Sequence, residues 1–287
     1  MSTPTQIPAS PVSPLIVQLF YERPPLLDME QLTARVQAYC GRVSQDSKSL
    51  PAPGSNRAHY FMLDALATFA QGQLPSQLCV CFGEKPPSME ELAPSLQQTW
   101  DWPEAAQVVS QCSHFLIAND LMAATADRKV RNRQFRGFLR ALQELAPCSA
   151  MHWMNTQMFV NPARFLYQQG EAALAAQLYG SINARFYNIE GSGSDMLMDT
   201  LGLGVLGLPD LQCHFRELPP GEVARVLFNT ALYLFEQGDI IKDGQTIPGV
   251  LPDDRWVCQH ENSLVPPQRI ILDMNPGGRH AAGNRNV

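Results

Sequence analysis

The sequence has few charged residues and no long apolar run. Only 17% of its 287 residues are Asp, Glu, Lys or Arg, against about 25% in an average globular protein. This low share excludes a solvated coiled coil and a highly charged disordered chain. No stretch approaches the about 18 consecutive apolar residues of a membrane-spanning helix. The residues before Leu15 lack a basic start and an apolar centre. We therefore expect no secretory signal, a disordered lead over residues 1–14, and a cytoplasmic protein that does not engage a membrane.

The seven cysteines lack C-x-x-C spacing, and the six histidines lack the H-x-H, H-x-x-x-H and H-E-x-x-H spacings of metal sites. We therefore expect no metal and no cofactor. Cys79 and Cys81 would share one face of a strand, and we interpret them as small core side chains. His114 and His214 follow closely on Cys112 and Cys213. We interpret both as hydrogen-bonded structural histidines, with a thiol–imidazole pair as the alternative.

Two glycine-rich segments lack the surroundings of a nucleotide site. Gly202–Gly207 matches G-x-G-x-x-G, but Pro209 and a strand-like run follow, so no helix can begin where a pyrophosphate would bind. The segment 190–195 lacks the lysine of a phosphate-binding loop. We expect a tight apolar turn at the first segment and a hairpin loop at the second.

The sequence does contain alternating strand-like and helix-like segments, separated by many of its 23 prolines and 19 glycines. This pattern predicts an α+β fold with mixed, mainly antiparallel sheets and packed helices. Helices are expected over 29–40, from 89 to near 100, 127–145, 162–169 and 221–237. Strands are expected over 15–20, 59–64, 77–82, 113–119, 150–154, 182–189, 195–201, 211–215, 255–261 and 269–274.

The order of these segments repeats loosely, which suggests two similar fused lobes. We expect an N-terminal lobe over 15–147, a C-terminal lobe over 148–275 and a flexible tail over 276–287. The lobes would meet near Pro147, and residues 41–57 would form a long loop.

Acidic residues are frequent in the C-terminal third of the chain. Paired carboxylates can serve as general acid and base or bind a metal, but turn and cap duties explain several of these. A hydrolase using these acids and histidines therefore remains an alternative. The acids are Asp195, Asp199, Asp210, Asp239, Asp243, Asp253, Asp254 and Glu261. A further group is interpreted as core, with an exposed binding surface as the alternative: Trp100, Trp102, His152, Trp153 and Met154.

One predicted helix is strongly basic although the chain carries a net charge of −6. Its apolar stripe should be buried, which would leave an arginine-rich face for an acidic protein partner. A solvated or internally paired face is the alternative, and the acidic balance disfavours nucleic acid. The candidate partner-binding residues are Arg128, Lys129, Arg131, Arg133, Arg136 and Arg140.

The C-terminal third resembles a bacterial family known only as a domain of unknown function. Its signature is a T-x-G-L-x-x-L-G-x-P-E turn, a helix and a G-D-x-x-x-D-G-x-T-I-G segment. Asp210 stands where Glu is usual, and Pro248 where Gly is usual. The likeness extends more weakly over Leu15–Met274. The matching residues look architectural: Thr200, Gly202, Gly207, Pro209, Asp210, Gly238, Asp239, Asp243, Gly244 and Thr246.

The resemblance implies a role but no catalytic residue. Similar proteins look like companions of interbacterial toxins, including type VI secretion and Rhs-type systems. The chain would then be an immunity protein whose partner is a cognate toxin or effector, which it occludes without chemistry of its own. An effector adaptor or chaperone, or a hydrolase, remains the alternative.

Overall fold

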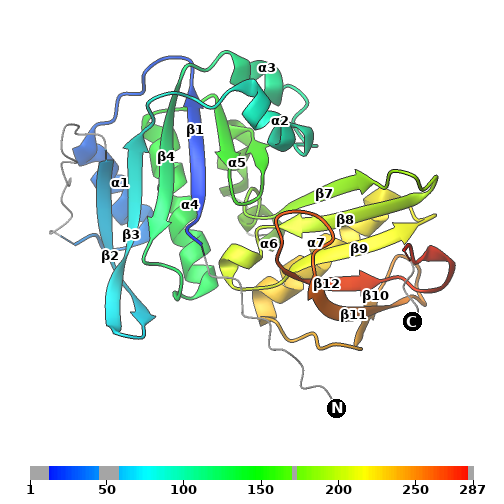
Figure 1. Cartoon of the computed structure of the whole chain (residues 1–287). Helices are drawn as coiled ribbons and strands as arrows, with labels where there is room; N and C mark the ends of the chain where they lie inside the picture. Colours follow the sequence, from blue (N-terminus) through cyan, green and yellow to red (C-terminus); the bar gives the residue numbers. More distant parts are fainter. Residues whose placement is uncertain (1–12, 45–57, 170–172, 284–287) are drawn as a thin grey trace. The chain divides into compact units, whose positions relative to one another are not determined.

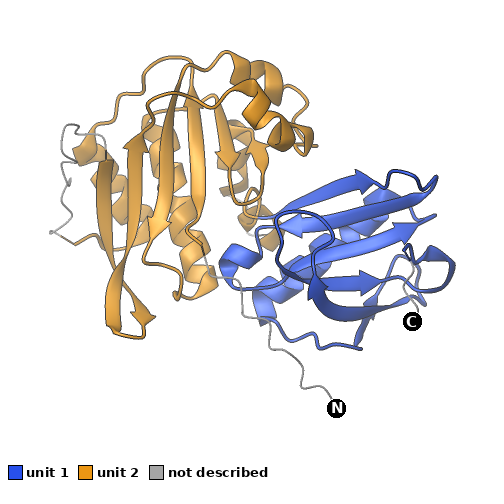
Figure 2. Ribbon diagram, viewed as in Figure 1, with its two compact units in different colours: residues 1–12, 182–287 blue, residues 13–181 orange. Residues whose placement is uncertain are grey.

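The structure is a computed structural model that describes residues 13–44, 58–169 and 173–283. It divides into two compact units (Figure 2). The first unit covers Ser13–Ser181 and is the orange part, labelled unit 2 in the figure key; the second unit runs from Ile182 onward and is the blue part, labelled unit 1. Each unit holds one six-stranded sheet with helices packed on it. The fold is therefore α+β with mainly antiparallel sheets, as the sequence predicts.

The division lies between Ser181 and Ile182, and not near Pro147 as the sequence analysis expected. The strands that follow Pro147 belong to the first sheet, since β5 (Ala150–Trp153) pairs with β1 (Ile16–Tyr21). Strand β6 (Met158–Val160) then pairs with β5. The sequence of a short apolar strand does not show which distant strand it will pair with. The order of predicted segments therefore placed this boundary wrongly.

The first sheet has the order β2-β3-β4-β1-β5-β6, and all of its neighbours are antiparallel (Figure 1). Its remaining strands are β2 (Ala58–Phe69), β3 (Gly72–Phe82) and β4 (His114–Leu121). Its helices are α1 (Met29–Cys40), α2 (Met89–Gln97), α3 (Ala105–Ser110), α4 (Arg128–Leu145), α5 (Pro162–Gln169) and α6 (Leu174–Gln177).

Both faces of the first sheet are covered near β1, which explains the apolar run that begins the lobe. Alternation along β1 places Val17 and Leu19 on the face of Trp153, whose ring meets Phe135 of α4 edge to face at 6.0 Å. Phe20 lies on the opposite face, in a core cluster with residues of α2 and α3. The sequence of a strand that is buried on both faces is continuously apolar.

Local capping signals set the ends of the first helices as the sequence predicts. The Asp28 carboxylate accepts from the amides of Glu30 and Gln31 at the start of α1. Helix α2 begins with a capping box in which Ser88 and Glu91 bond to each other's backbone amides. These interactions span three residues, so they can be read directly from sequence.

The second sheet has the order β10-β11-β12-β9-β8-β7, in which only the β12–β9 pair is parallel. Its strands are β7 (Asn183–Asn188), β8 (Asp195–Leu201), β9 (Asp210–Arg216), β10 (Thr246–Pro248), β11 (Arg255–Asn262) and β12 (Ile270–Asn275). Helix α7 (Pro220–Gln237) packs against β7, β8 and β9, and its buried residues include Val223, Leu227 and Leu234. The apolar side of β9, with Leu211, Cys213 and Phe215, supplies the matching core.

The two glycine-rich segments form turns, as predicted. The segment after β8 is a single 3-10 turn over Gly204–Leu206 that leads into β9, and Gly202 and Gly207 have φ values of 121° and 76°. Glycine adopts such positive φ values without strain. Residues 190–194 connect the antiparallel strands β7 and β8 as a hairpin loop.

Three expectations fall partly on residues outside the described ranges: the lead over 1–14, the loop over 41–57 and the tail over 276–287. Within the described part of the tail, Ala282 is buried and its amide donates to the His214 carbonyl at 3.3 Å. Ala281 also forms a β-bridge with Phe215. The stretch 276–283 is therefore fixed to the second sheet and is not a free tail.

Candidate functional site

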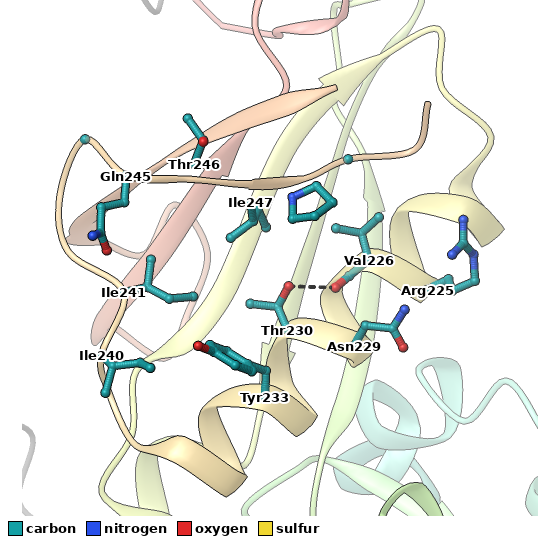
Figure 3. Close-up of a pocket in the computed structure, with 13 residues that line it drawn as sticks. Arg225, Val226, Asn229, Thr230, Tyr233, Ile240, Ile241, Gln245, Thr246 and Ile247 are labelled. Atoms are coloured by element: carbon teal, nitrogen blue, oxygen red, sulfur yellow. Dashed lines mark hydrogen bonds between the residues drawn. The ribbon is translucent and has the colours of Figure 1, made fainter. Parts of the chain in front are cut away.

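A groove of about 830 Å³ runs along α7 in the second unit (Figure 3). One wall is the helix, and the other is the chain segment that returns from it towards β10. The volume lies within the usual range for sites that bind small molecules. The lining residues are Arg225, Val226, Asn229, Thr230, Tyr233, Ile240, Ile241, Gly244, Gln245, Thr246, Ile247, Pro248 and Gly249.

The helical wall presents two rows of side chains four residues apart, because such residues lie on the same face of a helix. Val226 and Thr230 form one row and are buried, and the Thr230 hydroxyl donates to the Val226 carbonyl at 2.9 Å. Asn229 and Tyr233 form the other row and are exposed. The helix thus contributes buried side chains to the floor of the groove and exposed side chains to its rim.

The opposite wall is built by turns that the sequence signature encodes. Helix α7 ends at Gly238, which has a φ of 91°, and the chain reverses at Gly244, which has a φ of 80°. Ile241 and Ile247 are buried and complete the apolar floor, whereas Ile240 remains 45% exposed. Figure 3 shows the returning segment facing the helix, with Ile241 and Ile247 directed into the space between them.

An Asp–His–Asp cluster holds this wall in place. The ring of His260 on β11 lies between two carboxylates, with Nδ1 at 2.7 Å from Asp243 Oδ1 and Nε2 at 3.3 Å from Asp239 Oδ1. The His260 backbone amide also donates to Asp243 Oδ1 at 2.8 Å, and these hydrogen bonds lower the pKa of Asp243. The two signature aspartates therefore brace the groove wall against β11.

The polar groups at the rim are mostly neutral. Asn229 and Gln245 carry amides, and Thr246 and Tyr233 carry hydroxyls. The Arg225 guanidinium is paired with the Glu222 carboxylate, at 2.9 and 2.6 Å. An apolar floor with amides and hydroxyls at its rim fits a short peptide segment, because amides bond to peptide groups while the floor receives an apolar side chain.

A buried ion-pair cluster occupies the second sheet. Asp199 accepts from Arg185 at 2.9 and 2.5 Å and from Arg269 at 2.6 Å. Arg269 also donates to Asp210 at 3.0 Å, and the Leu203 amide donates to the same carboxylate at 3.0 Å. Burial raises the pKa of Asp210 to about 6, although the nearby Arg269 opposes this rise.

The cluster also fixes the loop that contains the cis Pro266–Pro267 bond. Arg185 donates to the Pro266 carbonyl at 2.9 Å and Arg269 to the Pro267 carbonyl at 2.7 Å. Asp199 and Asp210 are fully enclosed, so their carboxylates stabilise this loop and offer no surface to a substrate.

The structure corrects the assignment of an arginine-rich partner face on α4. Arg131 and Arg136 are each only 3% exposed and cannot touch a partner. Arg131 donates to both oxygens of Asp120, at 2.5 and 3.0 Å. Arg136 donates to the carbonyls of Tyr179 and Ala176, and burial lowers its pKa to about 9.

The other basic residues of α4 differ in exposure and in pairing. Arg140 donates to Glu144 at 2.8 Å and lies over the Tyr39 ring at 4.4 Å. Arg128 and Lys129 are half-buried, whereas Arg133 is exposed. The alternative interpretation was that the arginines of this helix bond to groups within the molecule. It holds for Arg131, Arg136 and Arg140.

The ten signature residues cluster at two places in the second unit. Thr200, Gly202, Gly207, Pro209 and Asp210 form the turn between β8 and β9, where Thr200 Oγ1 accepts from the Leu211 amide at 2.8 Å. Gly238, Asp239, Asp243, Gly244 and Thr246 form the groove wall and its brace. These positions agree with an architectural role for the ten residues. The second set also lies beside the groove.

The aromatic and histidine candidates are mostly internal. Trp102, His152 and Trp153 are buried, while Trp100 and Met154 are exposed. His114 bonds to Ser113 Oγ at 2.9 Å in the first unit, and His214 lies on β9 in the second.

Sequence reasoning missed a buried Ser–His–Gln chain in the first unit. His152 Nδ1 lies 2.9 Å from Gln18 Oε1, and its Nε2 lies 2.9 Å from Ser95 Oγ. Because the amide oxygen can only accept, Nδ1 donates and Nε2 accepts from Ser95. The imidazole also stacks on Phe159 at 4.5 Å, and burial lowers the pKa of His152 to about 4. All three polar side chains are buried, so these hydrogen bonds satisfy polar groups of the core. Gln18 and His152 become neighbours only through the pairing of β1 with β5.

Across residues 13–44, 58–169 and 173–283, no group of three or more His, Cys, Asp or Glu is arranged to hold a metal ion. Over the same ranges, no helix is both long and apolar enough to cross a bilayer.

Comparisons with known proteins point to the second unit. No curated protein and no solved structure matches the chain. Residues 199–275, which contain the groove and the signature residues, match a family model described as a domain of unknown function, DUF4261.

Proposed function

We propose that this chain is an immunity protein that binds a cognate antibacterial toxin and neutralises it by occlusion. The groove along α7 would receive a short segment of the toxin, and no chemistry of the chain itself is required. The observation that carries this proposal is the preformed groove, with an apolar floor and an amide-bearing rim, inside the DUF4261-like segment.

Two features of the groove support tight protein binding. Tyr233 and Ile240 are 48% and 45% exposed, and exposed aromatic and aliphatic anchors beside a pocket are typical of interface hot spots. The wall that carries Ile240 is braced by the bonds from His260 to Asp239 and Asp243. A rigid groove loses little conformational entropy when a partner binds, which favours high affinity.

The identity of the partner rests on the resemblance to proteins that accompany interbacterial toxins. The toxin would be the product of a neighbouring gene in the same operon. Because immunity by occlusion requires burial of toxin surface, we expect a stable complex that abolishes the toxin's activity in vitro.

The test combines binding with inhibition. We expect Tyr233→Asp and Ile240→Asp to weaken the calorimetric affinity for the toxin by about 30-fold or more each, the effect of losing an interface hot spot. Tyr167→Asp, on an exposed residue of α5 in the first unit, is the matched control and should bind as the wild type does.

Three outcomes would decide against parts of this proposal. A lack of complex formation with the neighbouring toxin would refute toxin binding. Full binding by both groove variants would place the interface elsewhere. A complex in which the toxin stays active would favour the alternative role of an adaptor or chaperone that delivers an effector.

A further inference from the structure

One edge of the second sheet opens into the groove along α7. Strand β10 is the last strand in the sheet order, and among the described residues it pairs with β11 alone. All three of its residues line the groove and face the helix across it (Figure 3). A strand at the edge of a sheet carries backbone N–H and C=O groups that can pair with a further strand. The groove therefore offers a hydrogen-bonding backbone as well as side chains.

The direction of the backbone groups in β10 follows from its pairing with β11. The Cys258 amide donates to the Gln245 carbonyl at 2.8 Å, so this carbonyl points towards β11. Backbone groups of successive residues in a strand point to opposite sides, so those of Ile247 also point towards β11. The amide and carbonyl of Thr246 and the carbonyl of Pro248 then point to the open edge. Proline has no N–H, so Pro248 contributes only an acceptor there.

The side chains of β10 alternate as well, and one of them forms part of the groove floor. Ile247 is buried and directed towards α7, whereas Thr246 and Pro248 are exposed. Residues directly opposite each other in adjacent strands have side chains on the same face of the sheet. A residue opposite Ile247 in an added strand would therefore direct its side chain into the floor, beside Val226 and Ile241. The two neighbours of that residue would direct theirs to the exposed face.

We infer that the groove binds an extended peptide segment of its protein partner as an antiparallel strand added to β10. This inference rests on the proposed function, because it specifies how a toxin segment occupies the groove. In this arrangement one residue of the segment exchanges two backbone hydrogen bonds with Thr246. The amide two residues earlier in the segment donates to the Pro248 carbonyl. The residue between them lies opposite Ile247 and is apolar, and its neighbours are free to be polar.

The open edge favours an extended strand over a docked helix. A helix bonds its own backbone groups internally, so it would leave the amide and carbonyl of Thr246 without a protein partner. Pro248 keeps the edge short, because an added strand cannot accept a bond from a missing N–H. The chain just beyond is held close to the sheet, since a Cβ at Gly249 would lie 2.1 Å from Nε1 of the buried Trp256. The site is thus a short, preformed edge that matches the three residues of β10.

Thr246→Pro tests the added strand from the side of this chain. The substitution removes the amide that faces the open edge and leaves the ladder between β10 and β11 in place. We expect the calorimetric affinity for the toxin of the neighbouring gene to fall by about tenfold or more, because a carbonyl of the bound segment is left unpaired. The matched control Thr246→Val keeps the amide and changes only the exposed side chain, so it should bind as the wild type does. Equal affinity of the two variants would overturn the inference.

Amide hydrogen exchange of the wild-type chain gives a second readout that requires no variant to fold. The Thr246 amide should exchange about tenfold or more slowly in the toxin complex than in the free chain, because it gains a hydrogen bond. The Gln245 amide already donates to the Lys242 carbonyl at 3.0 Å, so its exchange should change less. Unchanged exchange at Thr246 in a stable complex would contradict strand addition.

A peptide library separates this inference from the proposed function. Random heptapeptides displayed on phage and selected on the wild-type chain should share one apolar residue between polar neighbours. The corresponding synthetic peptides should bind Thr246→Val but lose affinity for Thr246→Pro. Failure to select any peptide with this behaviour would overturn strand addition, even if the toxin binds. Selection of such peptides together with a toxin that does not bind would support the strand site and refute the immunity role.

Discussion

His152 shows how burial of one residue makes stability depend on pH. Its imidazole is neutral in the core, because its two ring nitrogens bond to Gln18 and Ser95 and its pKa is lowered to about 4. In the unfolded chain the pKa returns to near 6.5. The unfolded state therefore binds a proton more readily than the folded state between these two values.

We expect this difference to destabilise the first unit by about 3 kcal/mol as the pH falls from 6.5 to 4. Above pH 6.5 the contribution of His152 is constant, since the ring is neutral in both states. Urea unfolding of the wild type and of His152→Asn at several pH values measures it. The difference between the two free energies of unfolding should change by about this amount between pH 6.5 and 4, and a constant difference would show that His152 has the same pKa in the folded and unfolded states.

Substitution of Arg269 tests how much the buried ion-pair cluster contributes to the stability of the second unit. Its guanidinium bonds to Asp199 at 2.6 Å and Asp210 at 3.0 Å, so Arg269→Met would leave buried carboxylates with too few partners. We expect a loss of about 3–5 kcal/mol at pH 7.5. Arg225→Met, which removes an exposed pair with Glu222, should cost less than about 1 kcal/mol.

The cost of Arg269→Met should also depend on pH. Removal of the cation raises the pKa of Asp210 further, since Arg269 is the largest influence that lowers it. Protonation would then relieve the buried charge, so the variant should be less destabilised at pH 5 than at pH 7.5. Chemical denaturation at both values checks this, and a pH-independent loss would mean that Asp210 does not carry the effect.

At the scale of elements, the sequence predicted most clearly those features that depend on close neighbours. The end of α1 at Cys40 and the start of α2 at Met89 follow from caps within three residues. The strand at 195–201 was also predicted with its full range, because its turn residues lie beside it. The short strands β6 and β10 were missed because they carry three residues each, too few to show a period.

The prediction of an arginine-rich partner face on α4 was wrong for a different reason. Its periodicity correctly predicted a buried stripe through Phe135 and Phe138. It did not reveal that Arg131 would meet Asp120 at the end of β4, or that Arg136 would meet carbonyls near Tyr179. Those partners become neighbours only through the tertiary fold.

Charge reversal on α4 should therefore destabilise the protein and not merely slow its association with a partner. Arg131→Glu and Arg136→Glu each replace a buried, bonded cation with an anion, and we expect losses of at least about 3–5 kcal/mol. Arg133→Glu, on the exposed position of the same helix, should stay within about 0.5 kcal/mol of the wild type. Thermal unfolding measures all three, and a stable Arg131→Glu variant would contradict the burial of this side chain.

The candidate groove was only partly accessible from sequence. The turn at Gly244 and the end of α7 at Gly238 were predicted, and both shape its wall. That Tyr233 and Ile240 remain exposed beside a buried floor depends on how the returning segment crosses the helix. This crossing is set by the His260 brace, whose partners lie about 20 residues away in sequence.

At the scale of the whole molecule, the two units repeat an order of elements. Strand β1, helix α1 and the next three strands give the order β2-β3-β4-β1, and β9, α7 and their three following strands give β10-β11-β12-β9. The directions differ, since β1 and β4 are antiparallel while β9 and β12 are parallel. The loose repeat in sequence thus corresponds to strand order and not to an identical topology.

This organisation predicts that each unit folds without the other. Every strand pairs within its own unit, and both the His152 chain and the Arg269 cluster are complete within one unit. We expect fragments 13–181 and 182–287 to unfold cooperatively when expressed separately, as calorimetry and hydrogen exchange would show. In the full chain, Arg131→Glu should then lower only the transition assigned to the first unit, and Arg269→Met only that of the second. A single transition lowered equally by both variants would mean that the units fold as one cooperative body, because a local loss of stability spreads to every residue that unfolds with it.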